Sequence, residues 1–391
     1  MMRATMTFAD NENSVLWTKG CGVRSVSATI LRLPTIRAHK LSNAMVSYQD
    51  IVLVKVLLDN GIVGIGEAAT LGGPRWAEES VESIKSIIDL HLAPSIVGQQ
   101  ASFFEANAIR MSKAATRNYA AKGAMESALI DAVGLTLNLP ASAFLGGQVR
   151  DRMGVIWALA SGDIGQELEE AKEKLHLKEH RDFKVKLGFT SPEHDIQRLT
   201  RLREGLGDQI KIIVDVNQGW SEAQCITLLP ILEELKVALV EQPIKASLRS
   251  NLARVAARTS IPFLLDEGAF QKEEIADIAS NAGASVYSLK LVKSGGLFEM
   301  KRAAAVAAAH GMELYGGCLL ESSVGSAAHL AVFCTLPELQ WGTEHFGSRI
   351  LVEDIAVNSL KFENFEILVP TGPGLGVQPN DDLIQFYARQ N

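Results

Sequence analysis

The segments IKIIVD (210–215), ALVE (238–241), FLLD (263–266) and VYSLK (286–290) decide the fold of this chain. Each is a short apolar run that ends in a charged residue, as a buried strand of a parallel sheet does. The end residues Asp215, Glu241, Asp266 and Lys290 follow one another at intervals of 26, 25 and 24 residues. A strand, a helix and two short loops occupy about that length. The spacing therefore predicts repeated βα units.

Similar runs continue the pattern on both sides, and helical stretches lie between them. The eight runs are Val155–Ala160, Phe183–Leu187, Ile210–Val216, Ala238–Gln242, Phe263–Asp266, Val286–Lys290, Glu313–Gly316 and Gln340–Gly342. Eight such units in about 200 residues predict a modified (β/α)8 barrel, with one helix missing or replaced. No sequence repeat accompanies the spacing, which excludes a solenoid.

The residues around this barrel, placed at 151–355, predict a second domain and two terminal segments. Residues 23–150 begin with apolar runs, two of which are joined by Asn60-Gly61, a strong hairpin signal, and continue with three helical stretches between residues 78 and 137. This order predicts an N-terminal α+β capping domain. Residues 1–22 are expected to form a flexible tail. Residues 356–391 are expected to return to the capping domain through one strand at Phe362–Val369 and a glycine-rich turn.

Composition excludes several classes of protein. The chain has 391 residues, 38 Lys and Arg against 45 Asp and Glu, and a net charge of −7, so a basic nucleic-acid surface is not expected. The sequence contains no run of about 18 apolar residues, so a membrane-spanning helix is not expected. Its four cysteines form no C-x-x-C pair, and the N-terminus lacks the apolar core of a secretory signal. A reduced, cytoplasmic protein is therefore expected.

Charged side chains at the strand ends predict the active site, because a barrel enzyme builds its site there. The residues at these ends are Lys184, Lys186, Asp215, Asn217, Glu241, Asp266, Lys290, Glu321 and Glu344. Asp215, Glu241 and Asp266 would repel one another unless a cation lay between them. Oxygen ligands without nearby His or Cys suit Mg²⁺ or Mn²⁺.

Lysines flank these carboxylates, and lysine beside a metal ion has a characteristic chemistry. A divalent ion and neighbouring lysines should lower the pKa of Lys186 and Lys290 toward neutrality. Such a lysine can exchange a proton with the carbon next to a carboxylate, while the ion stabilises the enolate. This combination is the pattern of the enolase superfamily.

Local motifs strengthen that comparison. In order along the chain, K-V-K (184–186), D-V-N (215–217), E-Q-P (241–243), D-E (266–267) and S-L-K-L-V-K-S-G-G (288–296) resemble the muconate lactonizing branch of the enolase superfamily. L-P-T-I-R (33–37), W-A-L-A-S-G-D (157–163), L-Y-G-G (314–317) and G-T-E-H-F-G (342–347) are similar to bacterial muconate cycloisomerases. The resemblance runs from about residue 23 to residue 388.

The resemblance implies an intramolecular lyase of catechol catabolism that converts cis,cis-muconate, a small dicarboxylate, to muconolactone. It implies that the metal is bound by Asp215, Glu241 and Asp266. It implies that Lys186 delivers a proton to the α-carbon, that Lys290 holds the carboxylate from the opposite face, and that Glu321 is a second proton-transfer group. Supporting roles are expected for Lys184, Asn217 and the lid residues Tyr48 and Trp76. The family is commonly homo-oligomeric, often octameric.

Three positions depart from the family pattern, and alternatives stay open. Gly268 stands where a Ser is expected, His345 replaces a Leu and is expected to pack in a loop or face solvent, and Arg349 bears either on substrate charge or on a subunit contact. Chloromuconate cycloisomerase is the nearest alternative, because residues 183–192 resemble that branch. Dipeptide epimerase, o-succinylbenzoate synthase and a non-catalytic binding protein on the same barrel are more distant ones.

Overall fold

The computed structural model describes residues 19–42 and 44–389 of the chain. The expected tail therefore lies outside the described residues up to residue 18. From Cys21 onward the chain belongs to the capping domain, because the Cys21 side chain is buried and its carbonyl accepts a hydrogen bond from the Ala101 amide at 2.8 Å. The last residues assigned to the tail are thus part of the first domain.

The capping domain opens with an antiparallel sheet in the order β1-β2-β3. Its strands are β1 (Val23–Lys40), β2 (Met45–Leu58) and β3 (Val63–Thr70). The pairing of β2 with β3 confirms the predicted hairpin. Of Asn60-Gly61, however, only Gly61 has a positive φ, +85°. The reason is a longer loop, in which the Leu58 amide donates to the Ile62 carbonyl at 2.9 Å.

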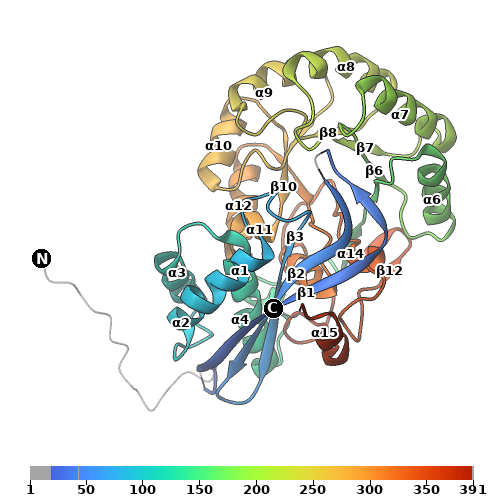
Figure 1. Cartoon of the computed structure of the whole chain (residues 1–391). Coiled ribbons are helices and arrows are strands. Elements are labelled where there is room, and N and C mark those ends of the chain that lie inside the picture. The colour runs from blue at the N-terminus through green and yellow to red at the C-terminus, as the bar shows by residue number, and fades with distance from the viewer. Residues whose placement is uncertain (1–18, 43, 390–391) are drawn as a thin grey trace, which may run out of the picture.

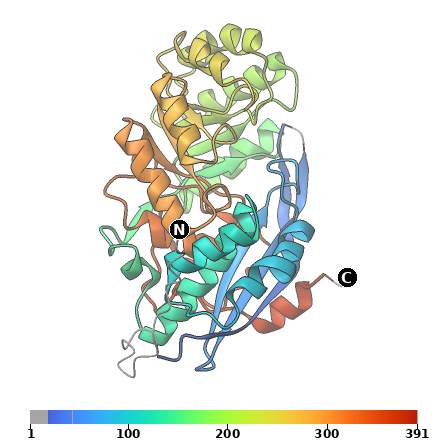
Figure 2. The same cartoon turned by 90° about the vertical axis from the view of Figure 1, so that its left-hand side faces the viewer.

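Helices follow the sheet and cover one of its faces (Figure 2). They are α1 (Val81–Ile87), the π-helical turn η1 (Ile88–Leu92), α2 (Ala93–Ile96), α3 (Phe104–Ala114), α4 (Tyr119–Leu137) and the short α5 (Ala141–Phe144). A Cβ atom added at Gly64 or Gly66 would lie 2.2 or 2.1 Å from a carbonyl oxygen of α4. These glycines let α4 pack directly against β3.

Seven parallel strands form the barrel, which confirms the predicted fold (Figure 1). They are β5 (Trp157–Leu159), β6 (Phe183–Lys186), β7 (Ile212–Asp215), β8 (Leu239–Glu241), β9 (Phe263–Leu265), β10 (Val286–Leu289) and β11 (Glu313–Gly316). The connecting helices are α6 (Ile164–His176), α7 (Pro192–Leu206), α8 (Glu222–Glu234), α9 (Arg249–Ala256), α10 (Lys272–Ser280), α11 (Leu291–Ser294), α12 (Leu297–Ala309) and α13 (Ser323–Phe333).

The eighth predicted strand is reduced to a bridge at one residue. Thr343 pairs in parallel with both Gly316 and Val155, and so joins β11 to the segment that leads into β5. Its amide donates to the Gly154 carbonyl at 2.9 Å, and its carbonyl accepts from the Ile156 amide at 2.8 Å. The short helix α14 (Gly347–Ile350) stands where an eighth barrel helix would lie.

Apolar side chains fill the barrel interior below the charged strand ends. This inner cluster consists of Ile156, Ile213, Leu239, Leu264, Val286 and Tyr315. Side chains alternate along a strand, so Asp215 shares a face with Ile213 and Glu241 with Leu239. The charged groups therefore form a layer directly above an apolar floor.

The C-terminal segment differs from the single strand expected. Residues Phe362–Glu363 (β12) and Glu366–Leu368 (β13) form a hairpin, and β13 pairs with β4 (Arg152–Gly154) at the entry to the barrel. The left-handed residues Asn364 and Phe365, with φ of +51° and +69°, make the tight turn. Helix α15 (Asp381–Tyr387) then packs against β1. No helix of the described part of the chain has the length and apolar character that crossing a bilayer requires.

Candidate active site

Three buried carboxylates lie side by side at the carboxyl ends of β7, β8 and β9. Asp215 stands opposite Glu241 in the parallel register, and Asp266 directly follows β9. Each is 1% exposed. The structure thus brings the three predicted ligands to one place, because neighbouring parallel strands end at the same edge.

The predicted lysines pair with these carboxylates. Lys186 Nζ lies 2.5 Å from Asp215 Oδ2, and Lys290 Nζ lies 2.5 Å from Asp266 Oδ2. Lys186 also donates to Asn217 Oδ1 at 3.3 Å, as a supporting role for Asn217 requires. Lysines on β6 and after β10 therefore approach the carboxylates from two sides of the barrel.

Lys184 occupies a different environment from Lys186, although both point inward. Its Nζ lies 2.5 Å from Glu241 Oε2 and also donates to Glu344 Oε2. The Tyr315 hydroxyl donates to the same oxygen of Glu344 at 3.0 Å, and the Cys318 amide donates to Glu344 Oε1 at 2.9 Å. Lys184 is thus fixed by two carboxylates at the base of the site.

Three further charged residues lie in this layer, Glu267, Lys293 and Glu344, of which the sequence selected only Glu344, as a strand-end residue without a specific role. Lys293 Nζ donates to the Asp266 carbonyl at 3.0 Å, and Glu267 Oε1 accepts from the Asn217 amide group at 3.2 Å. The strand-end rule that selected Asp215 points equally to Glu344, which follows the eighth run. No comparable signal distinguishes Lys293, which lies one helical turn after Lys290.

The carboxylates meet the electrostatic requirement of a cation site. Burial and the neighbouring Asp215 carboxylate hold the pKa of Glu241 well above its usual range. Burial and Asp266 raise the pKa of Glu267 to about 7. The five carboxylates of the layer exceed its four lysines by one charge when all are ionised. A divalent ion among Asp215, Glu241 and Asp266 would reverse that balance and leave net positive charge for an anionic substrate.

The neighbouring carboxylates shift the lysine pKa values upward, whereas the lowering expected from the sequence depends on a divalent ion bound among them. Burial has the largest single effect and lowers the pKa of Lys186, but the Asp215, Glu241 and Glu344 carboxylates together raise it more, and the net shift is upward. Lys290 behaves in the same way beside Asp266. The carboxylates outweigh the neighbouring lysines, so both side chains are ammonium ions, the form that can donate a proton.

Glu321 lies apart from this layer, between β11 and α13, with two histidines beside it. Its Oε1 is 4.0 Å from His329 Nε2, and its Oε2 is 3.9 Å from His345 Nε2. The possible ligand atoms of these three residues all lie within 4.8 Å of one another, as in a metal-binding group. His345 is fully buried in the loop before α14, as the loop-packing alternative expects, and it does not face solvent.

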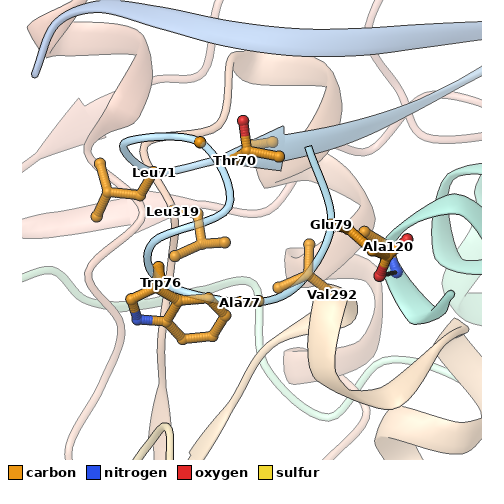
Figure 3. A pocket seen from close by; sticks show the side chains of 10 residues that line it. Thr70, Leu71, Trp76, Ala77, Glu79, Ala120, Val292 and Leu319 are labelled. Carbon is orange, nitrogen blue, oxygen red and sulfur yellow. Dashed lines mark hydrogen bonds between the residues drawn. The ribbon is translucent and has the colours of Figure 1, made fainter. Parts of the chain in front are cut away.

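Of the two expected lid residues, the structure places Trp76 at the site but not Tyr48. Trp76, in the loop after β3, has its ring centroid 4.4 Å from Lys290 Nζ. With Leu71, Val292 and Leu319 it lines a small cavity of about 10 Å³ between the two domains (Figure 3).

Strand alternation explains the position of Tyr48. Its side chain is 56% exposed beside Arg32, and the structure does not bring it to the site. The next residue, Gln49, turns inward and donates to the Leu319 carbonyl at 2.8 Å. His39, which sequence reasoning did not select, is also buried. Its burial lowers its pKa most, and the charge of Lys186 lowers it further.

Two departures from the family pattern find a physical reason. The Gly268 and Asp266 amides both donate to Gln242 Oε1, at 2.9 and 3.1 Å. A Cβ at Gly268 would lie 2.5 Å from Leu265 Cδ1, so a side chain there would require the Leu265 side chain to move. Arg349 is half-exposed, with its guanidinium 5.0 Å from the Phe362 ring centroid and 3.9 Å from Glu179, and it does not face the carboxylates.

Known proteins resemble this chain over nearly its whole length. The mandelate racemase / muconate lactonizing enzyme N-terminal domain matches residues 25–146, and the enolase C-terminal domain-like family matches residues 166–383. Muconate cycloisomerase 1 of Acinetobacter baylyi is 39% identical over 94% of this chain and 99% of its own length. A chloromuconate cycloisomerase of a Pseudomonas species is 38% identical with the same coverage.

A solved structure agrees with these sequence matches. The muconate lactonizing enzyme of Pseudomonas fluorescens, complexed with muconolactone, superposes with a TM-score of 0.93 at 39% identity, covering 95% of this chain and 100% of that one. The two matched domains support one conclusion. The order of the charged strand ends and the similarity to these relatives agree with it. The chain is an enzyme of the enolase superfamily and belongs to its mandelate racemase / muconate lactonizing enzyme family.

Proposed function

We propose that the chain is a metal-dependent cycloisomerase that converts cis,cis-muconate to muconolactone in aromatic catabolism. The observation that carries this proposal is the pair of opposed lysines, Lys186 and Lys290, on either side of three buried carboxylates. The relatives named muconate cycloisomerase support the choice of substrate.

The chemistry assigns each group a task. One substrate carboxylate forms a C–O bond to the diene, and the α-carbon next to the other carboxylate takes a proton from Lys186 Nζ. Lys290 lies on the other side of the site and binds the negative charge that develops on that second carboxylate. Asp215, Glu241 and Asp266 would hold Mn²⁺ or Mg²⁺, which supplies electrostatic stabilisation of the enolate when bound. Glu321 is the second proton-transfer group.

Lactone formation converts a dianion to a monoanion, so each turnover takes up one proton. Muconate consumption is followed by ultraviolet absorbance, the product is identified by NMR, and proton uptake is measured in a pH-stat. We expect muconolactone with one proton consumed per molecule. Absence of turnover with Mn²⁺ and Mg²⁺ would reject the proposal and favour the epimerase or synthase alternatives.

Chloromuconate cycloisomerase is the second candidate, because residues 183–192 resemble that branch and several relatives carry that name. An apolar pocket discriminates against one added substituent by only about 1–3 kcal/mol. We therefore expect the enzyme to process 3-chloromuconate detectably but less well than muconate. The ratio of kcat/KM values measures the preference, and a tenfold advantage for the chlorinated substrate would reverse the assignment.

The proposed function also sets expectations for the state of the protein. A catabolic enzyme acting on a soluble dicarboxylate is expected in the cytoplasm, and the family resemblance implies a homo-oligomer, possibly an octamer. Light scattering of the purified protein measures the number of subunits.

A further inference from the structure

The residues beside Glu321 form a buried polar group that the proposed reaction does not yet use. Glu321 is 2% exposed, His329 is 1% exposed and His345 is fully buried. The two imidazole rings lie against each other, with centroids 4.4 Å apart and a 43° angle between their planes.

The hydrogen bonds of His329 define its protonation state. Its Nε2 accepts a hydrogen bond from the Leu291 amide at 2.9 Å and therefore carries no proton. Its Nδ1 lies 2.8 Å from the Gly325 carbonyl, which can only accept, so Nδ1 carries the proton. Both ring nitrogens are thus satisfied, and His329 has no free lone pair for Glu321.

The hydrogen bonds of His345 leave one nitrogen free. Its Nδ1 lies 2.6 Å from the Thr343 hydroxyl oxygen, and that hydroxyl already donates to the Gly316 carbonyl at 3.0 Å. Nδ1 must therefore be the donor, and Nε2 bears the lone pair. Burial holds the pKa of His345 well below its usual value, so the ring stays neutral.

Two buried polar atoms of this group are left without a partner. Among the described residues, His345 Nε2 has no hydrogen-bond partner, and neither has Glu321 Oε1. Glu321 Oε2 accepts from the Leu319 amide at 2.8 Å. His345 Nε2 lies 3.9 Å from Glu321 Oε2, too far for a direct hydrogen bond, so one water molecule would have to join the two groups. A lone pair facing a carboxyl group favours the protonated form of that carboxyl.

We propose that His345 is a positioning residue for Glu321: its unprotonated Nε2 accepts, through one water molecule, the hydrogen bond of the neutral Glu321 carboxyl and keeps that carboxyl an acid. The catalytic consequence rests on the proposed function, in which Glu321 transfers a proton. The hydrogen bond itself does not depend on the proposed function, because it can be measured without substrate.

Other titratable groups face Glu321 from each element around it. They are Lys290 after β10, Cys318 and Glu344 from the strand ends, His329 on α13 and Glu67 on β3. Burial raises the pKa of Glu321 to about 7 against the opposing effect of the Lys290 ammonium. Glu67 is itself held by the Ser322 hydroxyl and by the Ser322 and Gly325 amides, so it is not free to accept a proton from Glu321.

The direct test observes the carboxyl group by infrared spectroscopy. The C=O stretch of neutral Glu321 is identified by its loss in Glu321→Gln. His345→Asn keeps a donor for Thr343 but ends short of Glu321, and His345→Leu is a second variant in case the first fails to fold. We expect the band to move to higher wavenumber and its titration midpoint to fall by about half to one pH unit. The exposed His310→Asn should change neither.

Turnover provides the second arm. If Glu321 donates a proton, the basic limb of the pH profile of kcat/KM should move to lower pH in His345→Asn, by the same amount as the infrared midpoint. This shift should be absent when Glu321 is also replaced by Gln. Full turnover in Glu321→Gln would reject the catalytic role of Glu321 while the infrared result still decides the hydrogen bond. An unchanged midpoint in both His345 variants would overturn the proposal. So would stoichiometric zinc that is lost in these variants, because an ion held by Glu321, His329 and His345 would then occupy the position of the water.

Discussion

Lys186 shows how much of this site is determined by a single side chain. Its Nζ lies 2.5 Å from Asp215 and 3.3 Å from Asn217, so two neighbours fix its position. It is 6% exposed, which removes competing solvent from the amine. A proton donor held in this way contributes about a hundredfold or more to a proton-transfer rate.

We therefore expect Lys186→Ala to lower kcat by at least about a hundredfold while a divalent ion still binds, since Lys186 is not a proposed ligand. Steady-state kinetics and a metal titration measure the two effects. Lys172→Ala, on the exposed side of α6, is the control. More than a tenth of normal turnover in Lys186→Ala would remove it from the mechanism.

A single substitution at Asp266 also tests the proposed metal site. Asp266→Asn removes one anionic ligand and also the partner of Lys290 and Lys293. We expect weaker Mn²⁺ affinity, seen as a higher metal concentration for half-maximal activity. The exposed Asp208→Asn should behave as the unaltered protein. Full turnover of the unaltered enzyme after exhaustive chelation would contradict the assignment.

At the scale of elements, glycines allow the backbones of α4 and β3 to pack closely together. Gly66 and Gly64 bring the strand against carbonyl oxygens of the helix, where a Cβ has no room. The neighbouring residues of α4 are mostly alanines, so the helix and sheet meet at their backbones.

We expect Gly66→Ala to lower the free energy of unfolding by about 1–3 kcal/mol, because the added methyl group would lie 2.1 Å from the Ala124 carbonyl. Denaturant unfolding measures the loss. Gly154→Ala is a matched control, since a Cβ there has nothing within 4 Å. Equal stability of the two variants would show that α4 can move away from the sheet.

The elements that periodicity could predict are those with strong local patterns. Regularly spaced apolar runs located seven barrel strands, and the strand ends located Asp215, Glu241, Asp266, Lys186 and Lys290. The eighth strand failed because Thr343 closes the barrel through backbone bridges that have no sequence pattern. The prediction that Tyr48 lies at the site was wrong for another reason. A shift of one residue along a strand reverses the face, and Gln49 is the residue that turns inward.

At the scale of the whole molecule, buried carboxyl groups outside the site govern the response to pH. Glu126 on α4 is 3% exposed, and burial raises its pKa from 4.5 to about 7. Burial raises the pKa of Asp131, on the same helix, to about 7 as well. Unfolding would return these groups to water.

The sign of the effect follows from proton binding. The unfolded chain releases the Glu126 proton near pH 4.5, whereas the folded protein keeps it until about pH 7, so stability falls as the pH rises through this window. Glu126→Gln should remove up to about 3 kcal/mol of this loss. Urea unfolding at pH 5 and pH 8 measures it, with the exposed Glu204→Gln as control. An unchanged difference between the two pH values would show that Glu126 titrates normally.

Glu67 has a consequence for how such proteins can be recombined. It belongs to the capping domain, yet its carboxyl group occupies the amino end of α13, where it accepts hydrogen bonds from the Ser322 and Gly325 amides beside Glu321. Gln49 makes a second crossing contact, to the Leu319 carbonyl. The two halves are therefore not interchangeable modules. A chimera that joins this capping domain to the barrel of a relative would lose these hydrogen bonds next to Glu321. Transferring residues 319–325 together with the capping domain would keep them.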